Sequence, residues 1–239
     1  MGFTPPRRAL LVAVLALAMA GAGLAQSLDQ VPFAKKLKLA KVGDEDAQVA
    51  VAMAYETGSE TALDAAEAAK WYRQAALQGN IEAQFRLARI VGHGAKGLKQ
   101  DYPTAIKLYE AAAAKGHGPA MNALGLAYQN GQGVAADPAK AAEWYRKAAE
   151  TRLAEAENNL GILYLNGKGV ARDLGEAFTL FERAANQGNG WGLNNLGGMH
   201  EMGWGTPKDR KKAIELYTQA AAKGIAAAQE NLERLTASP

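Results

Sequence analysis

Residues 116–151 read GHGPAMNALGLAYQNGQGVAADPAKAAEWYRKAAET, and a block with the same pattern recurs about every 36 residues along most of the chain. The blocks begin at six corresponding positions: Gly43, Gly79, Gly116, Arg152, Gly188 and Gly224. A fixed period of roughly 20–50 residues is the signature of a repeat architecture, in which each unit packs on its neighbours. The period therefore predicts the class of fold before any single motif is considered.

Each unit is expected to contain two helices joined by a glycine-rich turn. In the third unit Ala120, Leu124 and Tyr128 are spaced by four residues and share one helical face. Glycines such as Gly131 follow, and glycine can leave a helix in a left-handed conformation without a steric penalty. An aspartate typical of a helix N-cap then precedes the second apolar run in every unit: Asp64, Asp101, Asp137, Asp173 and Asp209.

The second helix of each unit carries a wide apolar stripe. In the third unit this stripe consists of Ala141, Trp144, Tyr145, Ala148 and Ala149. A two-helix unit leaves an apolar face that only the next unit can bury. We therefore predict an all-α, right-handed solenoid of helix-turn-helix repeats with a concave side.

The string AENNLGILYLNGKGVARD at residues 156–173 resembles a unit of the Sel-1-like repeat family, a branch of the tetratricopeptide-type helical solenoids. The resemblance covers residues 43–235 and divides them into five full units and one partial unit: 43–78, 79–115, 116–151, 152–187, 188–223 and 224–235. It implies a scaffold that binds other proteins. It says less about any activity, because one fold hosts many functions.

The N-terminal segment is predicted to be a signal peptide spanning residues 1–25. Arg7 and Arg8 precede an apolar run, and Gly23-Leu24-Ala25 is typical of a cleavage site after Ala25. The alternative is an uncleaved membrane anchor, since the apolar stretch is near the lower limit of roughly 17–25 residues. We expect a periplasmic or secreted bacterial protein, with a capping helix over residues 26–42 and a tail at residues 236–239.

Composition excludes several partners. Without Arg7 and Arg8 the chain carries 25 basic and 24 acidic residues, so neither nucleic acid nor an anionic membrane surface is indicated. Contact with a membrane is expected only through the signal peptide.

There is no cysteine, so no disulfide can form. Some exported Sel-1-like proteins are cysteine-rich and are associated with penicillin binding or hydrolysis, and this chain departs from their pattern.

No catalytic, metal or cofactor site is predicted. The three histidines, His93, His117 and His200, fall at different offsets of the repeat, and zinc requires three or four convergent ligands. We expect His200 to be held by a neighbouring backbone group or carboxylate. Residues 92–97 match G-x-G-x-x-G but lie at the turn of a repeat, where no strand precedes them. None of the serines outside the signal segment lies in a nucleophile motif.

Partner binding is predicted on the first helices, which line the concave side by analogy with tetratricopeptide-type arrays. The repeat offsets select the following candidates: Phe85, Arg89, Asn122, Leu126, Asn158, Ile162 and Asn194. Trp191 and Trp204 are added because the repeat does not require an aromatic residue at either place. Two alternatives stay open. The asparagines can bond between repeats, and the tryptophans can cover a thinner C-terminal core.

The favoured function is a non-enzymatic exported scaffold that binds a protein or peptide partner in the cell envelope. Its asparagines would bond the backbone of an extended peptide. One alternative is a glycan- or peptidoglycan-associated assembly factor, with the tryptophans stacking on sugars. Another is a penicillin-recognising hydrolase, for which the sequence offers no catalytic residues.

Overall fold

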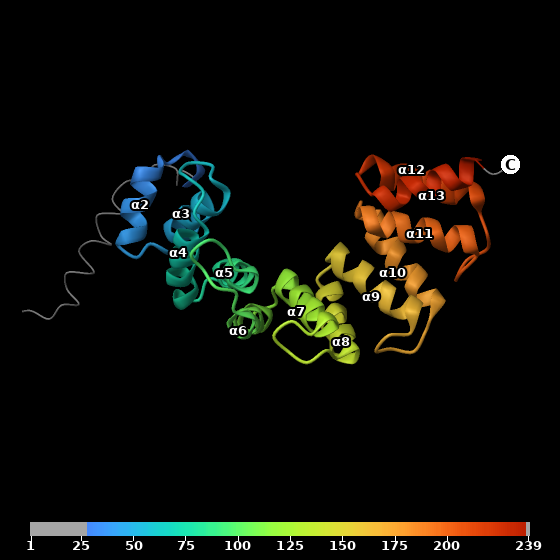
Figure 1. Cartoon of the computed structure of the whole chain (residues 1–239), viewed down its shortest axis with the longest axis horizontal. Helices are drawn as coiled ribbons and strands as arrows, with labels where there is room; N and C mark the ends of the chain where they lie inside the picture. Colours follow the sequence, from blue (N-terminus) through green and yellow to red (C-terminus); the bar gives the residue numbers. More distant parts are fainter. Residues whose placement is uncertain (1–27, 238–239) are drawn as a thin grey trace, which may run out of the picture.

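The computed structural model describes residues 28–237, and most of this region is helical (Figure 1). The predicted signal peptide lies outside the described residues. A short 3-10 turn, η1 (Leu28–Gln30), precedes the following helices: α2 (Phe33–Lys41), α3 (Glu45–Thr57), α4 (Ala65–Gln78), α5 (Ile81–His93), α6 (Tyr102–Ala113), α7 (Gly118–Asn130), α8 (Pro138–Glu150), α9 (Ala154–Asn166), α10 (Leu174–Asn186), α11 (Gly190–Met202), α12 (Arg210–Ala222) and α13 (Ala226–Ala237).

These helices form a solenoid. Within residues 28–237, α3 to α13 pack in sequence order, each on the helix before it and the helix after it, and α2 packs on α3. Figure 1 shows the resulting arc, with α5 and α7 on its inner side and α6 and α8 on its outer side. The prediction of an all-α solenoid of helix-turn-helix repeats is therefore confirmed.

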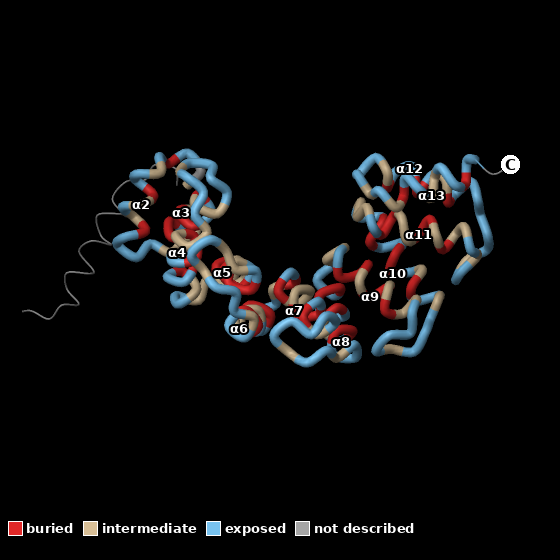
Figure 2. The backbone as a smooth tube through the Cα atoms, viewed as in Figure 1, coloured by how far each residue is buried: buried red, intermediate tan, exposed pale blue. Residues whose placement is uncertain are grey.

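The hydrophobic core is distributed along the array. Buried residues lie where successive helices meet, and the turns are exposed (Figure 2). In the fourth unit Leu160 and Phe181 are buried. A Cβ atom on Gly161 would lie 2.7 Å from Cε1 of Phe181, so glycine at this position allows the ring to lie directly against α9. Each unit thus contributes a separate part of one extended core.

The predicted aspartate caps are confirmed. Asp173 Oδ1 accepts hydrogen bonds from the backbone amides of Gly175 at 2.9 Å and Glu176 at 3.0 Å. The other four aspartates accept backbone amides at the starts of their helices in the same way: Asp64, Asp101, Asp137 and Asp209. Each cap satisfies amides that have no partner inside the helix and places a negative charge at the positive end of the helix dipole.

The glycine turns also form where the repeat predicts them. Gly58, Gly94, Gly131, Gly167 and Gly203 follow the first helices, all with positive φ. The residue that opens each repeat is left-handed as well, and in the fourth unit it is Arg152 with φ 61°. Arg152 is the single non-glycine residue with positive φ in the described part of the chain.

Within residues 28–237, no helix combines the length and the apolar character needed to cross a bilayer.

Replacing Arg152 with glycine should stabilise the protein. The left-handed conformation costs a residue with a side chain roughly 1–2 kcal/mol, and the greater freedom of glycine in the unfolded chain offsets part of that gain. We expect the free energy of unfolding of Arg152→Gly, measured by urea titration, to rise by about 0.5–1 kcal/mol. The matched control is Gly116→Ala, where a Cβ atom meets nothing within 4 Å and only the positive φ is unfavourable. That variant should be less stable, and the same sign of change in both would contradict the explanation.

Candidate partner-binding grooves

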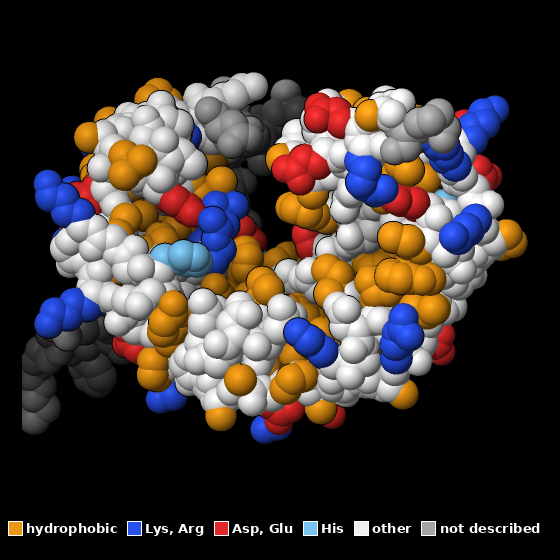
Figure 3. All heavy atoms as spheres, turned by 45° about the vertical axis from the view of Figure 1, so that its right-hand side comes forward, with side chains coloured by type: hydrophobic (Ala, Val, Ile, Leu, Met, Phe, Trp, Pro, Cys, Tyr) orange, Lys and Arg blue, Asp and Glu red, His pale blue; other side chains and the backbone are white. Residues whose placement is uncertain are grey.

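The first helices of the second and third units border an open groove of about 400 Å³, here called the α5–α7 groove. Four of the residues predicted to bind a partner line it: Phe85 and Arg89 from α5, and Asn122 and Leu126 from α7. Figure 3 shows the hollow of the arc, with hydrophobic side chains inside it and a histidine and basic side chains toward the N-terminal half. The sequence offsets therefore select neighbours in space.

Aromatic contacts fix one wall of this groove. The ring of Phe85 lies 6.0 Å from the ring of Tyr109 and 4.8 Å from the ring of His117. The guanidinium carbon of Arg89 lies 5.9 Å from the centre of the Phe85 ring, within the range of a cation–π contact. Leu126 is 38% exposed on the facing helix. The groove thus presents apolar surface next to the charged side chains of Arg89 and Glu155.

The asparagines of the first helices form a ladder of hydrogen bonds between repeats. Asn159 donates to Oδ1 of Asn122 at 3.0 Å, Asn195 donates to Oδ1 of Asn158 at 2.8 Å, and Asn231 donates to Oδ1 of Asn194 at 3.2 Å. This is the inter-repeat arrangement that the sequence left open. Asn158 is only 6% exposed, so its side chain belongs mainly to the ladder. Partner contact by the half-buried Asn122 and Asn194 stays a prediction.

A second polar contact recurs inside the units. The buried tyrosine of the second helix donates its hydroxyl proton to a side chain near the end of the first helix. The three pairs are Tyr72 with Glu56 at 2.6 Å, Tyr145 with Gln129 at 3.0 Å, and Tyr217 with Glu201 at 2.9 Å. Burial raises the pKa of all three hydroxyls above the usual range, so they remain proton donors. In the fourth unit both positions are apolar, Phe181 and Leu165.

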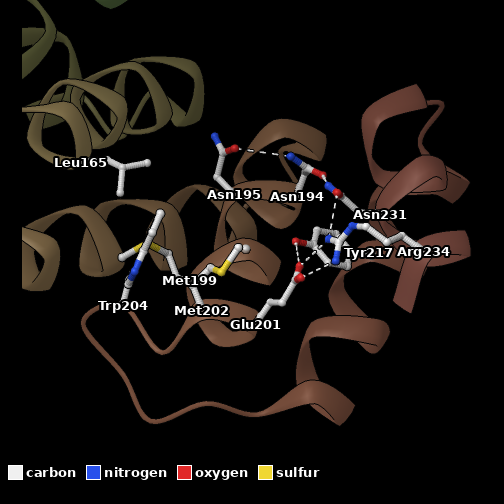
Figure 4. Close-up of a pocket in the computed structure, with 11 residues that line it drawn as sticks. Leu165, Asn194, Asn195, Met199, Glu201, Met202, Trp204, Tyr217, Asn231 and Arg234 are labelled. Carbon is white, nitrogen blue, oxygen red and sulfur yellow. Dashed lines mark hydrogen bonds and ion pairs between the residues drawn. The ribbon is translucent and has the colours of Figure 1, made fainter. Parts of the chain in front are cut away.

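A smaller pocket of about 210 Å³ lies between α11, α12 and α13 and is here called the C-terminal pocket (Figure 4). Trp204, Met202 and Leu165 form its apolar part, and Trp204 is 39% exposed. On its polar side Arg234 binds both carboxylate oxygens of Glu201, at 2.6 and 2.8 Å. This hydrogen-bonded pairing lowers the pKa of the Glu201 carboxyl. The pocket therefore combines an exposed aromatic surface with a fixed ion pair.

The remaining predicted residues lie apart from both grooves. Trp191 is 53% exposed at the start of α11 and lines neither the α5–α7 groove nor the C-terminal pocket. Ile162 is half-buried and packs against the C-terminal core. The structure therefore brings together four of the candidates in one groove, places Asn194 with Trp204 in another, and separates Asn158, Ile162 and Trp191 from these sets.

The histidines have distinct surroundings. His117 caps α7, because its Nδ1 accepts the backbone amide of Ala120 at 3.2 Å. The expectation that His200 is held by a polar neighbour is wrong for Nδ1, which is buried and has no hydrogen-bond partner within residues 28–237. Its ring packs edge-on against Phe178 at 5.5 Å. Among the described residues no group of three or more His, Asp or Glu side chains could hold a metal ion.

Family comparison agrees with this geometry. Five successive segments match the Sel1 repeat: residues 45–80, 81–117, 118–150, 154–189 and 192–225. The chain belongs to the Sel1 repeat family. Sel1 repeat proteins are generally non-enzymatic scaffolds that mediate protein–protein interaction, and this chain shares their solenoid. A comparison with curated protein sequences found no match.

Three solved structures extend the comparison. A protective antigen of uropathogenic Escherichia coli with an SLR fold is 32% identical, with a TM-score of 0.76 over 84% of this chain and 43% of that one. A Sel1 repeat protein from Oxalobacter formigenes is also 32% identical, with a TM-score of 0.76 over 85% of this chain and 58% of that one. This chain thus spans about half the length of these two structures. A putative Sel1 repeat protein from Klebsiella pneumoniae shares the fold at 24% identity, with a TM-score of 0.54 over 86% of this chain and 99% of that one.

Two residues of the α5–α7 groove were not selected from the sequence. Tyr109 occupies the same place in the repeat as the core tyrosine Tyr145, and His93 was considered only as a metal ligand, yet both line the groove. The sequence does contain a signal for Tyr109. In three other units a glutamate or glutamine bonds the equivalent tyrosine, and in the second unit Gly92 stands in place of that residue.

The ion pair of the C-terminal pocket gives a prediction on pH. A carboxyl group whose pKa is lowered in the folded state contributes stability above its unfolded pKa of about 4.5, and that contribution is lost as the pH falls through the folded pKa. Wild-type protein should therefore be more stable than Glu201→Gln at pH 7, and this difference should shrink below about pH 4.5. Urea titrations at several pH values measure it, with Glu215→Gln on the exposed face of α12 as the control. A difference that does not change with pH would contradict the assignment.

Proposed function

We propose that this protein is a non-enzymatic scaffold, exported to the cell envelope, that binds an extended segment of a protein partner along its first helices. The observation that carries the proposal is the α5–α7 groove. Its volume of about 400 Å³ falls within the roughly 300–1,000 Å³ typical of ligand sites. It combines apolar side chains with the amide of Asn122, the guanidinium of Arg89 and the carboxylate of Glu155, which can bond a peptide backbone and its polar side chains.

The rigidity of the array supports this function. The asparagine ladder joins the first helices α7, α9, α11 and α13 to one another, and the tyrosine contacts join the two helices within a unit. A binding surface that is ordered before the partner arrives loses less conformational entropy on binding. Export rests on the residues of the N-terminal segment, a basic pair followed by an apolar run and small residues.

A second surface for the same partner is proposed around the exposed tryptophans. Trp204 lies in the C-terminal pocket beside Met202 and Leu165, and Trp191 is exposed at the other end of α11. Large aromatic residues dominate binding energy at protein interfaces, and an exposed tryptophan loses apolar contact with water when a partner covers it. Neither tryptophan belongs to the buried C-terminal core cluster, so loss of either ring should leave that core intact.

Replacing Trp191 or Trp204 with alanine should therefore weaken capture of the partner by about 2 kcal/mol or more each, with little change in melting temperature. Crosslinking in intact cells, followed by recovery of complexes from the periplasmic fraction, measures capture and location together. The control is Leu77→Ala, which removes another exposed hydrophobic side chain, on the second helix of the first unit.

Three results would contradict the proposal. Both tryptophan variants could unfold at markedly lower temperature, which would make these residues part of the packing. The protein could be recovered from the cytoplasm alone. Binding could also be to isolated cell-wall sacculi and to no envelope protein, which would favour the glycan-associated function.

A further inference from the structure

The second unit breaks the pattern of paired tyrosines. Glu56, Gln129 and Glu201 reach the hydroxyl of the tyrosine in the second helix of their own units. At the same place in the second unit stands Gly92, which has no side chain. A Cβ atom there would lie 3.2 Å from Cβ of Ala105, so α5 and α6 approach closely at this point.

The consequence is a tyrosine with an unused hydroxyl. Among the described residues, no hydrogen bond to the hydroxyl of Tyr109 is formed, in contrast to Tyr72, Tyr145 and Tyr217. The atom is not sealed in the core, because Tyr109 lines the α5–α7 groove. Burial raises the pKa of this hydroxyl, and Arg89 partly opposes the shift. It therefore keeps its proton at neutral pH and can donate a hydrogen bond.

A recess lies beside this hydroxyl. Its volume is about 190 Å³, and it is bordered mainly by small or apolar residues, among them Gly92, Ala105, Ile106, Leu126 and Ala127. Tyr109, His93 and Leu126 line both this recess and the α5–α7 groove, so the two spaces are adjacent. Its mainly small and apolar lining suits an apolar side chain.

The groove beside the recess carries charge of both signs, because Arg89 and Glu155 both line it. Arg89 is exposed in the groove, and no ion pair between it and a carboxylate forms within residues 28–237. Arg86, three residues earlier, is different because it pairs with both Glu56 and Glu82. An arginine held over an apolar groove without a partner is complementary to a carboxylate on the molecule that occupies the groove.

We propose that this recess selects an extended acidic peptide segment of the partner, with an apolar side chain in the recess, a carboxylate on Arg89 and a peptide carbonyl on the hydroxyl of Tyr109. The peptide would satisfy a hydroxyl that has no hydrogen-bond partner among the described residues and would pair with the guanidinium of Arg89. This inference deepens the function proposed above and rests on it. The carboxylate can belong to Asp, to Glu or to a free C-terminus, since all three present the same chemistry to arginine.

The experiment uses the full chain and a synthetic library of 12-residue peptides, displayed once with free and once with amidated C-termini. The proposal expects enrichment of peptides with a large apolar residue within two positions of a carboxylate. Loss of binding on amidation identifies the C-terminus as the source, and retention identifies Asp or Glu. Enrichment of basic peptides, or equal binding of peptides without a carboxylate, would overturn the proposal.

The best acidic peptide is then measured by fluorescence anisotropy against two variants and two matched controls. Arg89→Glu should raise Kd at least tenfold, about 1.4 kcal/mol, whereas Arg73→Glu on α4 changes net charge equally and should not affect binding. Tyr109→Phe should raise Kd about threefold without lowering the melting temperature, because no internal hydrogen bond is lost. Tyr145→Phe should lower the melting temperature without raising Kd, since it loses its bond to Gln129 and neither residue lines the recess or the groove.

The results distinguish the proposed recess site from the proposed function as a protein-binding scaffold. Unchanged Kd values in Arg89→Glu and Tyr109→Phe would overturn the recess as the site. If the tryptophan variants still lost the partner in cells, binding by the scaffold would stand. Loss of binding in Arg73→Glu as well would show a charge effect without a specific site, and that result also overturns the proposal.

Discussion

The structure depends on burial of each unit's apolar face against the next unit. No single helix pair has a closed core: Phe181 of α10 is buried against α9 and belongs to the same cluster as Leu196 of α11. Burial of apolar surface at roughly 25 cal/mol per Å² is the main favourable contribution to folding, and here it accumulates from one interface to the next. Caps and glycine turns determine where each helix begins and ends, and thereby keep these interfaces in register.

The hydrogen bond of the buried tyrosine links two positions of a unit, so the residues at these positions depend on each other. A buried tyrosine hydroxyl requires a partner, and Glu56 or Gln129 supplies it inside the unit. In the fourth unit the ring is Phe181, which has no hydroxyl, and the apolar Leu165 stands where other units carry glutamate or glutamine. The second unit keeps Tyr109 but has Gly92 opposite, and the groove widens there into a recess. We propose that this departure from the repeat, rather than the repeat itself, marks the place for a partner.

Much of the fold could be predicted from the sequence, because the features that define it are local and recur. The period, the aspartate caps and the glycine turns each depend on neighbouring residues, and the structure confirms them. The asparagine ladder was open to two interpretations, because a bond such as Asn195 to Asn158 depends on the lateral spacing of first helices. The recess could not be predicted from the sequence either. Tyr109 has the sequence pattern of a core residue, and only the structure shows that Gly92 provides no side chain to bond its hydroxyl.

The most direct test of this account is native-state hydrogen exchange on Leu160→Ala. Leu160 is buried in the fourth unit, and removal of a core leucine costs about 2–5 kcal/mol. If stability resides in the interfaces between units, protection should fall in α9 and α10 and also in the adjoining α8 and α11. Loss of protection confined to α9 and α10 would contradict the account, because the units would then be stable independently of their neighbours.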